Sequence, residues 1–406
     1  MATKIKTITA GIKDENIRSD CYVELIINKS GGIKLQLKSK VESMYGESIR
    51  ELILDMCKYF SLKNAKITVE DYGALPFTLA ARIETAIKRA LPKTQNEYLL
   101  PLNKKSLYHT SKDRLRRSRL YLPGNEPKYF INAGLHKPDA IILDLEDSVA
   151  PSQKDAAQLI VRNALRSVNF YGCERMVRIN QLPNGLNDLD FIVPHNVHVI
   201  LIPKCESAEQ VKQVDNEIAR IKKEKNIKSD IYLMPIIESA LGVIKSFEIA
   251  TASKNNCGLA VGLEDYTSDI GTQRTEEGKE SFFARSMVVN AARAAGIQPI
   301  DTVYSDVTNT EGLRESVVES KSLGFEGKGC IHPRQVKVVH EVFAPTSKEI
   351  EKAKKIVLAF EEAEKKGLGV VSVGSKMIDP PVVKRAVKTI ELAKLSGIAE
   401  LVSASK

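Results

Sequence analysis

The sequence contains no tryptophan, and aromatic residues make up only 6% of its 406 residues. Proteins that bind single-stranded nucleic acid stack the bases on aromatic side chains, and no stacking motif accompanies the basic residues here. The net charge of +9 is spread over many segments, with a local excess around residues 112–119. We therefore expect no nucleic-acid partner and interpret the charge as a surface that attracts anionic small molecules.

Long apolar runs are also missing. No run approaches the roughly 18 apolar residues that a membrane helix requires, so we expect no membrane partner. The first residues, Met1-Ala-Thr-Lys-Ile-Lys, contain no apolar signal core, which predicts a cytoplasmic protein. The six cysteines show neither Cys-x-x-Cys spacing nor a metal-type pairing with histidine. They indicate buried thiols in a reducing compartment and argue against a zinc site.

The first 92 residues predict a small α+β domain. Two β-branched or alternating runs, 21–28 and 33–40, are separated by Lys-Ser-Gly-Gly, which is typical of a hairpin. Apolar residues then recur at helical spacing from Ile49 to Phe60. Residues 93–112 are mostly polar and have no sustained period, so they predict a linker.

Strand and helix patterns alternate from residue 113 to residue 343. Most of the strand candidates are continuous apolar runs, as expected for parallel strands that are covered on both faces. The clearest helices between them are 208–224 and 282–295. Eight such units predict a closed (β/α)8 barrel of the α/β class, with a doubly wound open sheet as the alternative. Residues 344–406 predict a C-terminal helical extension. The strand candidates are 119–123, 140–147, 175–180, 197–204, 231–238, 258–265, 297–305 and 327–332.

Several predicted strands end in polar residues, and two of these are acids on consecutive strands. Glu238 ends one apolar run and Asp265 ends the next. The carboxyl ends of parallel strands meet at one face of a barrel, where barrel active sites lie. Two carboxylates with water and substrate oxygens suit Mg2+. Arg178, at the end of a nearby strand, can stabilise a developing enolate oxygen. This set predicts cleavage or formation of a carbon–carbon bond through an enolate.

The alternative for each acid is a helix N-cap, because each precedes a predicted helix. Asp144, Glu146 and Asp147 close another strand, where one can orient metal-bound water while the others cap a helix or pair with arginine. Asp379, followed by Pro380 and Pro381, has the pattern of an N-cap with proline at the first helical position.

Residues 115–400 closely resemble the citrate lyase β-subunit family, which has the (β/α)8 fold. The matching stretches include Arg117-Ser-Arg-Leu-Tyr-Leu-Pro-Gly124, Leu143-Asp-Leu-Glu-Asp-Ser-Val149, Gly262-Leu-Glu-Asp-Tyr266 and Lys376-Met-Ile-Asp379. Further matches occur in the same order at 177–180, 201–204, 236–239, 301–306, 324–328 and 331–335. Members of this family cleave citryl, citramalyl or malyl thioesters to an acetyl thioester and a 2-oxo acid.

The resemblance implies roles for individual residues. Glu238 and Asp265 would bind Mg2+, and Arg178 would contact the substrate. Asp379 would transfer a proton in the site of a neighbouring subunit within a homotrimer, rather than only cap a helix. Arg117 and Lys204 would contact the CoA side of the thioester.

The first domain resembles the acyl carrier subunit of the same lyase complex, through Val41-Glu-Ser-Met-Tyr-Gly-Glu-Ser-Ile-Arg50 and Leu79-Ala-Ala-Arg-Ile-Glu84. That carrier holds a CoA-derived prosthetic group on a serine. The corresponding positions here are Glu15 or Arg18, depending on the direction of counting, and Ser19 is one residue away. Either Ser19 is the attachment site, with a citrate lyase-type transferase subunit as partner, or the domain is unmodified and the barrel takes free CoA thioesters. A class II pyruvate aldolase is a third interpretation, but it leaves the 376–379 motif and the first domain without a role.

Overall fold

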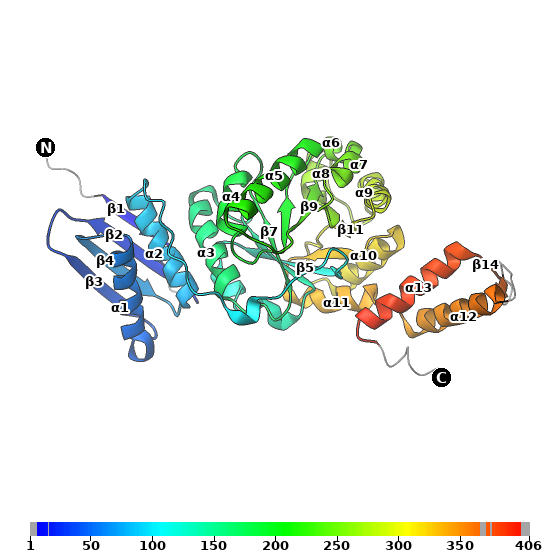
Figure 1. The fold of residues 1–406 in the computed structure, drawn as a ribbon, viewed down its shortest axis with the longest axis horizontal. Coiled ribbons are helices and arrows are strands. Elements are labelled where there is room, and N and C mark those ends of the chain that lie inside the picture. The colour runs from blue at the N-terminus through cyan, green and yellow to red at the C-terminus, as the bar shows by residue number, and fades with distance from the viewer. Residues whose placement is uncertain (1–5, 15, 366–370, 374–375, 399–406) are drawn as a thin grey trace.

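The computed structural model describes residues 6–14, 16–365, 371–373 and 376–398. An N-terminal α+β unit, a central barrel and a C-terminal helical extension follow one another along its longest axis (Figure 1). All six cysteines are buried and unpaired, as predicted. Within the described part of the chain, no helix is both long and apolar enough to span a lipid bilayer.

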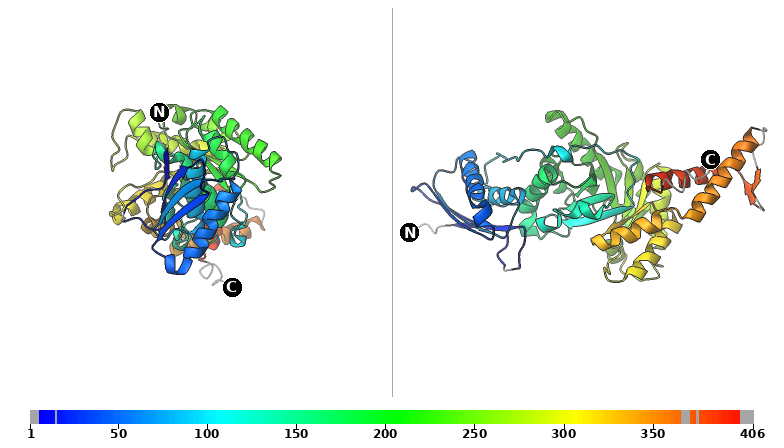
Figure 2. Two further views of the ribbon diagram at one scale, coloured as in Figure 1. Left: turned by 90° about the vertical axis from the view of Figure 1, so that its left-hand side faces the viewer. Right: turned by 90° about the horizontal axis from the view of Figure 1, so that it is seen from below.

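The N-terminal unit is a four-stranded sheet with two helices on one face. The strand order is β1-β2-β4-β3, with β3 parallel to β4 and the other pairs antiparallel. The predicted hairpin of residues 21–28 and 33–40 is therefore wrong, because β4 lies between these two strands. Side chains of β2 and β4 alternate between buried and partly exposed, so one face packs against the helices while the polar face is open to solvent (Figure 2). The elements are β1 (Thr7–Ala10), β2 (Cys21–Ile27), β3 (Ile33–Ser39), α1 (Glu42–Tyr59), β4 (Ala65–Asp71) and α2 (Pro76–Ala90).

Helix α2 joins this unit to the barrel through α3 (Lys154–Ser167). Arg162 of α3 donates two hydrogen bonds to the carboxylate of Glu84 on α2, and both side chains are fully buried. Phe77 stacks on Phe130 of the barrel with ring centroids 6.5 Å apart. Buried ion pairs and ring contacts need fixed geometry, so the N-terminal unit is held against the barrel and does not swing on a free linker.

Eight parallel strands close into a barrel, which confirms the (β/α)8 prediction and excludes the open sheet. Except for β5, the observed strands are shorter than the predicted ones, because the last predicted residues leave the hydrogen-bonded ladder and enter the loops. The strands are β5 (Ser118–Pro123), β6 (Ala140–Asp144), β7 (Glu174–Arg178), β8 (Val199–Ile202), β9 (Tyr232–Ile237), β10 (Gly258–Val261), β11 (Gln298–Asp301) and β12 (Gly327–Cys330).

Helices surround the barrel strands. The α-helices besides α3 are α4 (Gly185–Ile192), α5 (Ala208–Glu224), α6 (Ala240–Ile244), α7 (Ser246–Thr251), α8 (Leu263–Asp269), α9 (Phe282–Ala294), α10 (Thr310–Leu323) and α11 (Pro333–Phe343). In the part of the chain that the structure describes, short 3-10 helices lie at Lys104–Ser106, Pro127–Tyr129, Ala133–His136 and Pro151–Gln153. One apolar cluster fills the barrel interior, and a larger one lies between strands and helices.

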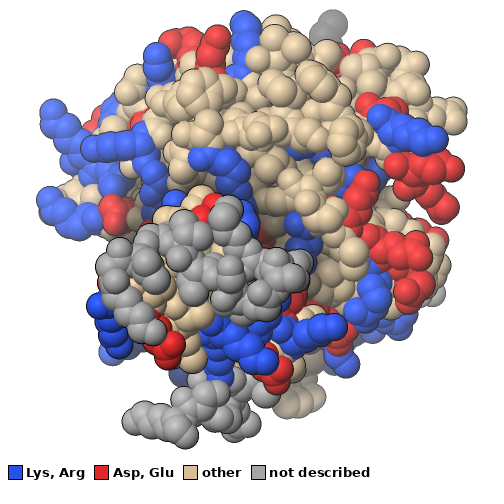
Figure 3. Space-filling model, turned by 90° about the vertical axis from the view of Figure 1, so that its right-hand side faces the viewer, with Lys and Arg blue, Asp and Glu red and all other residues tan. Residues whose placement is uncertain are grey.

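The C-terminal extension projects from the end of the barrel opposite the N-terminal unit (Figures 1 and 2). It consists of α12 (Ser347–Glu364), β13 (Val371–Val373), β14 (Lys376–Ile378) and α13 (Pro380–Leu395). The two helices pack together through a small apolar cluster of Ala353, Ile356, Ile378 and Ala386. On the face that carries the extension, acidic side chains gather along one edge, and lysines and arginines gather along the opposite edge (Figure 3).

Candidate functional site

The carboxyl ends of the barrel strands enclose a cavity of about 320 Å3. It is lined by Arg178, Glu238 and Asp265 among others, so the structure brings these three predicted residues together. Arg178 ends β7, Glu238 follows β9 and Asp265 follows β10. These strands run in the same direction in the closed barrel.

Glu238 is buried, with 6% of its surface exposed. Its Oε2 accepts a hydrogen bond from the backbone N–H of Lys204 at 2.8 Å. No lysine or arginine nitrogen among the described residues lies within ion-pair distance of its carboxylate. Burial raises the pKa of Glu238 to about 8, and the negative charges of Asp265 and Glu146 add to this effect, while Arg178 opposes it. A buried carboxylate without a cation is costly to ionise, so this position favours a bound cation.

Asp265 lies in the first turn of α8, and its side chain is 41% exposed. The N-cap of α8 is Gly262, and the N-cap of α6 is Ser239, whose hydroxyl accepts from the backbone N–H of Gly242. The alternative that Glu238 and Asp265 are helix caps is therefore wrong.

Arg178 is fixed by Asp144. Its Nε and Nη2 donate to the two carboxylate oxygens of Asp144 at 2.6 and 2.7 Å, and its Nη1 lies 3.0 Å from Glu146. Burial acts to lower the pKa of Arg178, but the hydrogen bonds and charge of Asp144 outweigh it and hold the guanidinium charged. Asp144 thus pairs with arginine. The sequence predicted this role for one or more of Asp144, Glu146 and Asp147 without saying which.

Lys204 lies just after β8 and faces acids. Its Nζ is 3.2 Å from Glu146, 3.4 Å from Asp147 and 3.5 Å from Asp265. The charges of Glu146, Asp147 and Asp265 raise the pKa of Lys204 although partial burial acts to lower it. Five carboxylates (Asp144, Glu146, Asp147, Glu238 and Asp265) lie around Arg178 and Lys204 here. Even with Arg119, which also lines the cavity, negative charge is in excess.

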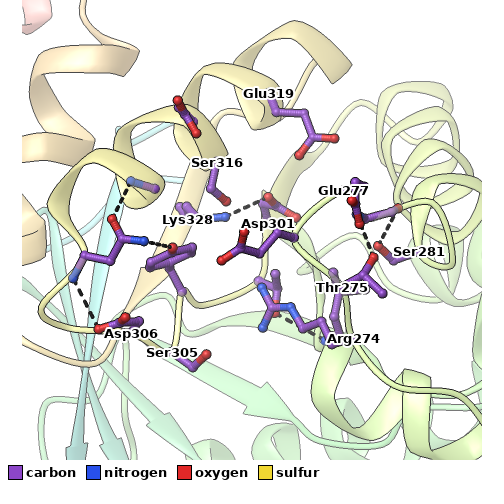
Figure 4. Close-up of a pocket in the computed structure, with 18 of the residues that line it drawn as sticks. Arg274, Thr275, Glu277, Ser281, Asp301, Ser305, Asp306, Ser316, Glu319 and Lys328 are labelled. Carbon is purple, nitrogen blue, oxygen red and sulfur yellow. Dashed lines mark hydrogen bonds and ion pairs between the residues drawn. The ribbon is translucent and has the colours of Figure 1, made fainter.

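A second, more polar cavity of about 750 Å3 adjoins the first and shares Leu263, Glu264, Asp301 and Thr302 with it (Figure 4). Asp301, fully buried, accepts from Lys328 at 3.0 Å and from Arg285 at 2.9 Å. Sequence reasoning assigned no role to this triad, although Asp301 and Lys328 lie within the matching stretches. Acidic residues outnumber basic ones in the lining of this cavity, which disfavours it as the place for phosphate groups.

The structure does not bring Arg117 to the site. Arg117 precedes β5, at the amino end of the strands, and its guanidinium pairs with Asp139 at 2.8 Å and donates to Ser396 at 3.2 Å. The reacting groups lie at the carboxyl ends, so the position of Arg117 does not support the predicted contact with a thioester bound to its own chain.

Asp379 and Ser19 also lie outside the cavity of their own chain. Asp379 is the N-cap of α13 and accepts from the backbone N–H of Val382 at 3.2 Å, as the Asp-Pro-Pro pattern predicts. Ser19 is half-buried in a left-handed backbone conformation with φ of 58°. Its neighbour Asp20 pairs with Arg82 of α2 at 2.7 Å, so the loop that carries Ser19 is anchored.

The donor set in the first cavity fits a divalent cation bound by two carboxylates. Gly262 leaves space for the Glu238 carboxylate, since a Cβ there would lie 2.8 Å from Cγ of Glu238. Within the described residues, no three Asp, Glu, His or Cys side chains converge in a ready-made metal cluster. The remaining ligands would come from substrate and water, as is common for Mg2+.

Comparison with known proteins gives two matches to family models. Residues 117–333 match the model described as HpcH/HpaI aldolase/citrate lyase. Residues 7–90 match the model described as malonate decarboxylase delta subunit (MdcD).

Individual proteins are also similar. The citrate lyase subunit beta of Haemophilus influenzae is 45% identical over 290 residues, which cover 71% of this chain and 99% of that protein. The mitochondrial citramalyl-CoA lyase of Mus musculus is 30% identical over 339 residues, 80% of this chain and 96% of that protein. The crystal structure of the protein CitE from Mycobacterium tuberculosis, in complex with magnesium, acetoacetate and coenzyme A, superposes with a TM-score of 0.58 and 27% identity. It covers 70% of this chain and 100% of that one.

Proposed function

Because the chain belongs to the HpcH/HpaI aldolase/citrate lyase family and is a carbon–carbon lyase, we propose that it cleaves a citryl- or citramalyl-type 3-hydroxyacyl thioester. The products are an acetyl thioester and a 2-oxo acid. The observation that supports this most directly is the buried, cation-free carboxylate of Glu238 beside Asp265 and Arg178. The relatives that act on citrate and citramalyl-CoA, and the CitE structure with magnesium and coenzyme A, support the same substrate class.

Glu238 and Asp265 are the residues that would hold Mg2+. When bound there, Mg2+ would chelate the carboxylate and the hydroxyl of the acyl group and draw electron density from the hydroxyl oxygen. Glu238 contributes a buried carboxylate held by the Lys204 N–H, and Asp265 contributes a carboxylate at the cavity mouth.

Arg178 stabilises the charge that develops during cleavage. The hydroxyl proton leaves, its oxygen becomes the carbonyl of the 2-oxo acid, and the electrons of the broken carbon–carbon bond form the enolate of the acetyl thioester. The guanidinium of Arg178 is held rigidly by Asp144, so it can stabilise the negative charge on the enolate oxygen without a change in its own position. The enolate carbon then takes up a proton to give the acetyl thioester.

Asp379 of a neighbouring subunit is the proposed proton carrier. It stands on an extension that projects away from the barrel of its own chain (Figure 1), which suits a residue that serves another subunit of a homotrimer. In the reverse direction the same carboxylate would remove a proton from the acetyl thioester.

Free CoA thioesters are the proposed substrates, rather than acyl groups carried by the N-terminal unit. A carrier must move its arm between sites, whereas the buried Glu84–Arg162 pair and the Phe77–Phe130 stack fix this unit on the barrel. The alternative, a citrate lyase complex component with a prosthetic group on Ser19 loaded by a transferase partner, is supported by the carrier-type match over residues 7–90.

The experiment is an assay of the purified protein with citryl-, citramalyl- and malyl-CoA, with Mg2+ and with chelator. Asp265→Ala should abolish cleavage, while Asp190→Ala, an exposed acid on α4 paired with Arg220, should not. Cleavage that persists without a divalent cation would contradict the proposal. Intact-protein mass spectrometry after expression with the prosthetic-group machinery tests the alternative, since a mass increment on Ser19 would support it.

A further inference from the structure

Lys204 contacts both proposed metal ligands by different parts of the same residue. Its backbone N–H donates to Glu238, and its ammonium lies 3.5 Å from Asp265. The backbone at Lys204 has a φ of 46°, in the left-handed region that few residues other than glycine adopt. This conformation lets the N–H and the side chain of one residue reach two different acids.

The ammonium of Lys204 has other partners besides Asp265. Glu146 and Asp147 lie 3.2 and 3.4 Å away, on the side of the cavity formed by the β6 loop. The side chain is 30% exposed, so a small shift toward these two acids is open to it. The ion-pair partners of this ammonium among the described residues are all acids, which disfavours the CoA contact that the family resemblance implied.

We propose that Lys204 is an internal counter-ion that pairs with Asp265 in the metal-free site and releases Asp265 when a divalent cation binds. The ammonium then pairs with Glu146 and Asp147 alone. This makes Lys204 a positioning residue that holds the ligand carboxylate in place before the cation arrives and limits the affinity of the site. The inference rests on the proposed function for the identity of the two metal ligands.

Lys204 and a divalent cation would compete for Asp265, which predicts how removal of the lysine changes cation affinity. A positive charge within a few ångströms of a ligand oxygen opposes a second cation, and the cation must also replace the existing ion pair. Removal of the lysine charge should therefore tighten cation binding, by about tenfold for a partly exposed charge. It should also lower the thermal stability of the metal-free protein, because the acids lose a neutralising partner.

The test measures binding of Mn2+ alone to the full chain by electron paramagnetic resonance, with thermal unfolding in the presence and absence of Mn2+. Lys204→Met should bind Mn2+ more tightly than wild type, and Lys204→Arg, which keeps the charge, should resemble wild type. Lys154→Met is the matched control. Lys154 donates to the backbone carbonyls of Leu145 and Glu146 and does not contact Asp265, so its removal should change the affinity much less.

Three outcomes would contradict the inference, and only the first also contradicts the proposed function. Wild-type protein that binds no Mn2+ would overturn the metal site and this inference with it. Wild-type protein that binds Mn2+, while Lys204→Met binds it equally or more weakly, would overturn the inference alone. Equal tightening by Lys154→Met and Lys204→Met would also overturn it, because the effect would then be a general change of charge rather than release of Asp265.

Discussion

Gly262 lies directly against the carboxylate of Glu238. A Cβ at residue 262 would overlap Oε1 of Glu238 and would lie 2.8 Å from Cγ and 3.0 Å from Cδ. The backbone of Gly262 has φ of −115°, which any residue can adopt. Glycine is therefore required here for space and not for conformation, and the space it leaves is filled by the proposed metal ligand.

Gly262→Ala should displace Glu238 without unfolding the barrel. A shift of about 1 Å in a catalytic group commonly costs about 100-fold in rate, so we expect a loss of that order in lyase activity together with weaker Mn2+ binding. Titration of Mn2+ and a steady-state assay measure both effects. Circular dichroism serves as the control for folding, and unchanged Mn2+ affinity would show that Glu238 is not a ligand.

The sequence was sufficient to predict the barrel and the meeting of Glu238 with Asp265, because consecutive parallel strands bring their carboxyl ends to one face. It was not sufficient to assign Asp144, since all three acids at 144, 146 and 147 lie near Arg178 and only the folded geometry gives Asp144 two hydrogen bonds from its guanidinium. The orientation of Lys204 depends on a left-handed backbone that no local pattern indicates. The CoA contact of Arg117 came from the family resemblance alone, although the predicted strand 119–123 already puts this residue before the strand, at its amino end.

Glu84→Gln should loosen the N-terminal unit from the barrel. The substitution removes the fully buried carboxylate partner of the Arg162 guanidinium and leaves Glu97, 3.2 Å away and 31% exposed, as its remaining acid. Breaking a buried pair costs about 3–5 kcal/mol, and because Glu97 remains we expect a loss at the lower end of that range. Hydrogen exchange of α2 and α3 amides measures the local loss. The double variant Glu84→Leu with Arg162→Met removes both charges and should recover much of the protection. Full protection in Glu84→Gln would show that the remaining contacts, among them the Arg89–Asp155 ion pair between α2 and α3, hold the unit without the Glu84–Arg162 pair.

His195 and His198 should make the protein sensitive to acid. Burial, reinforced by Arg166 for His195 and by Arg175 for His198, lowers the pKa of each to about 3. The unfolded chain takes up protons on these residues below about pH 6.5, whereas the folded chain does not, so each contribution to stability is present above that pH and is lost as the pH falls.

At pH 5 the loss should be about 2 kcal/mol for each histidine. His198→Gln should therefore lose less free energy of unfolding between pH 7.5 and pH 5 than wild type does. Urea unfolding at both pH values measures the difference, and an exposed histidine provides the control: His136→Gln, at a surface 3-10 helix, should not change the pH dependence. Identical pH dependence in His198→Gln and wild type would mean that His198 is protonated in the folded protein.

Asp379→Ser separates the two roles of Asp379. Serine caps a helix about as well as aspartate, whereas alanine costs about 1 kcal/mol, so Asp379→Ser should keep α13 intact while it removes the carboxylate. We expect cleavage, and proton exchange on acetyl-CoA, to fall by about 100- to 10,000-fold, the usual contribution of a positioned acid or base. Asp379→Ala should lose stability as well. If Asp379→Ser kept wild-type rates, Asp379 would act only as the N-cap of α13 and not in proton transfer.

Mixing the Asp379→Ser and Asp265→Ala variants tests whether two chains share one site. Each variant alone lacks one component, the proton carrier or the metal ligand. If Asp379 serves a neighbouring subunit, a mixed oligomer contains sites in which an intact Asp265 meets an intact Asp379 from another chain, and activity should return after subunit exchange. If Asp379 served its own barrel, every site in the mixture would lack one residue and no activity would return. Recovery that depends on subunit exchange therefore identifies the extension as a donated part of the neighbouring site.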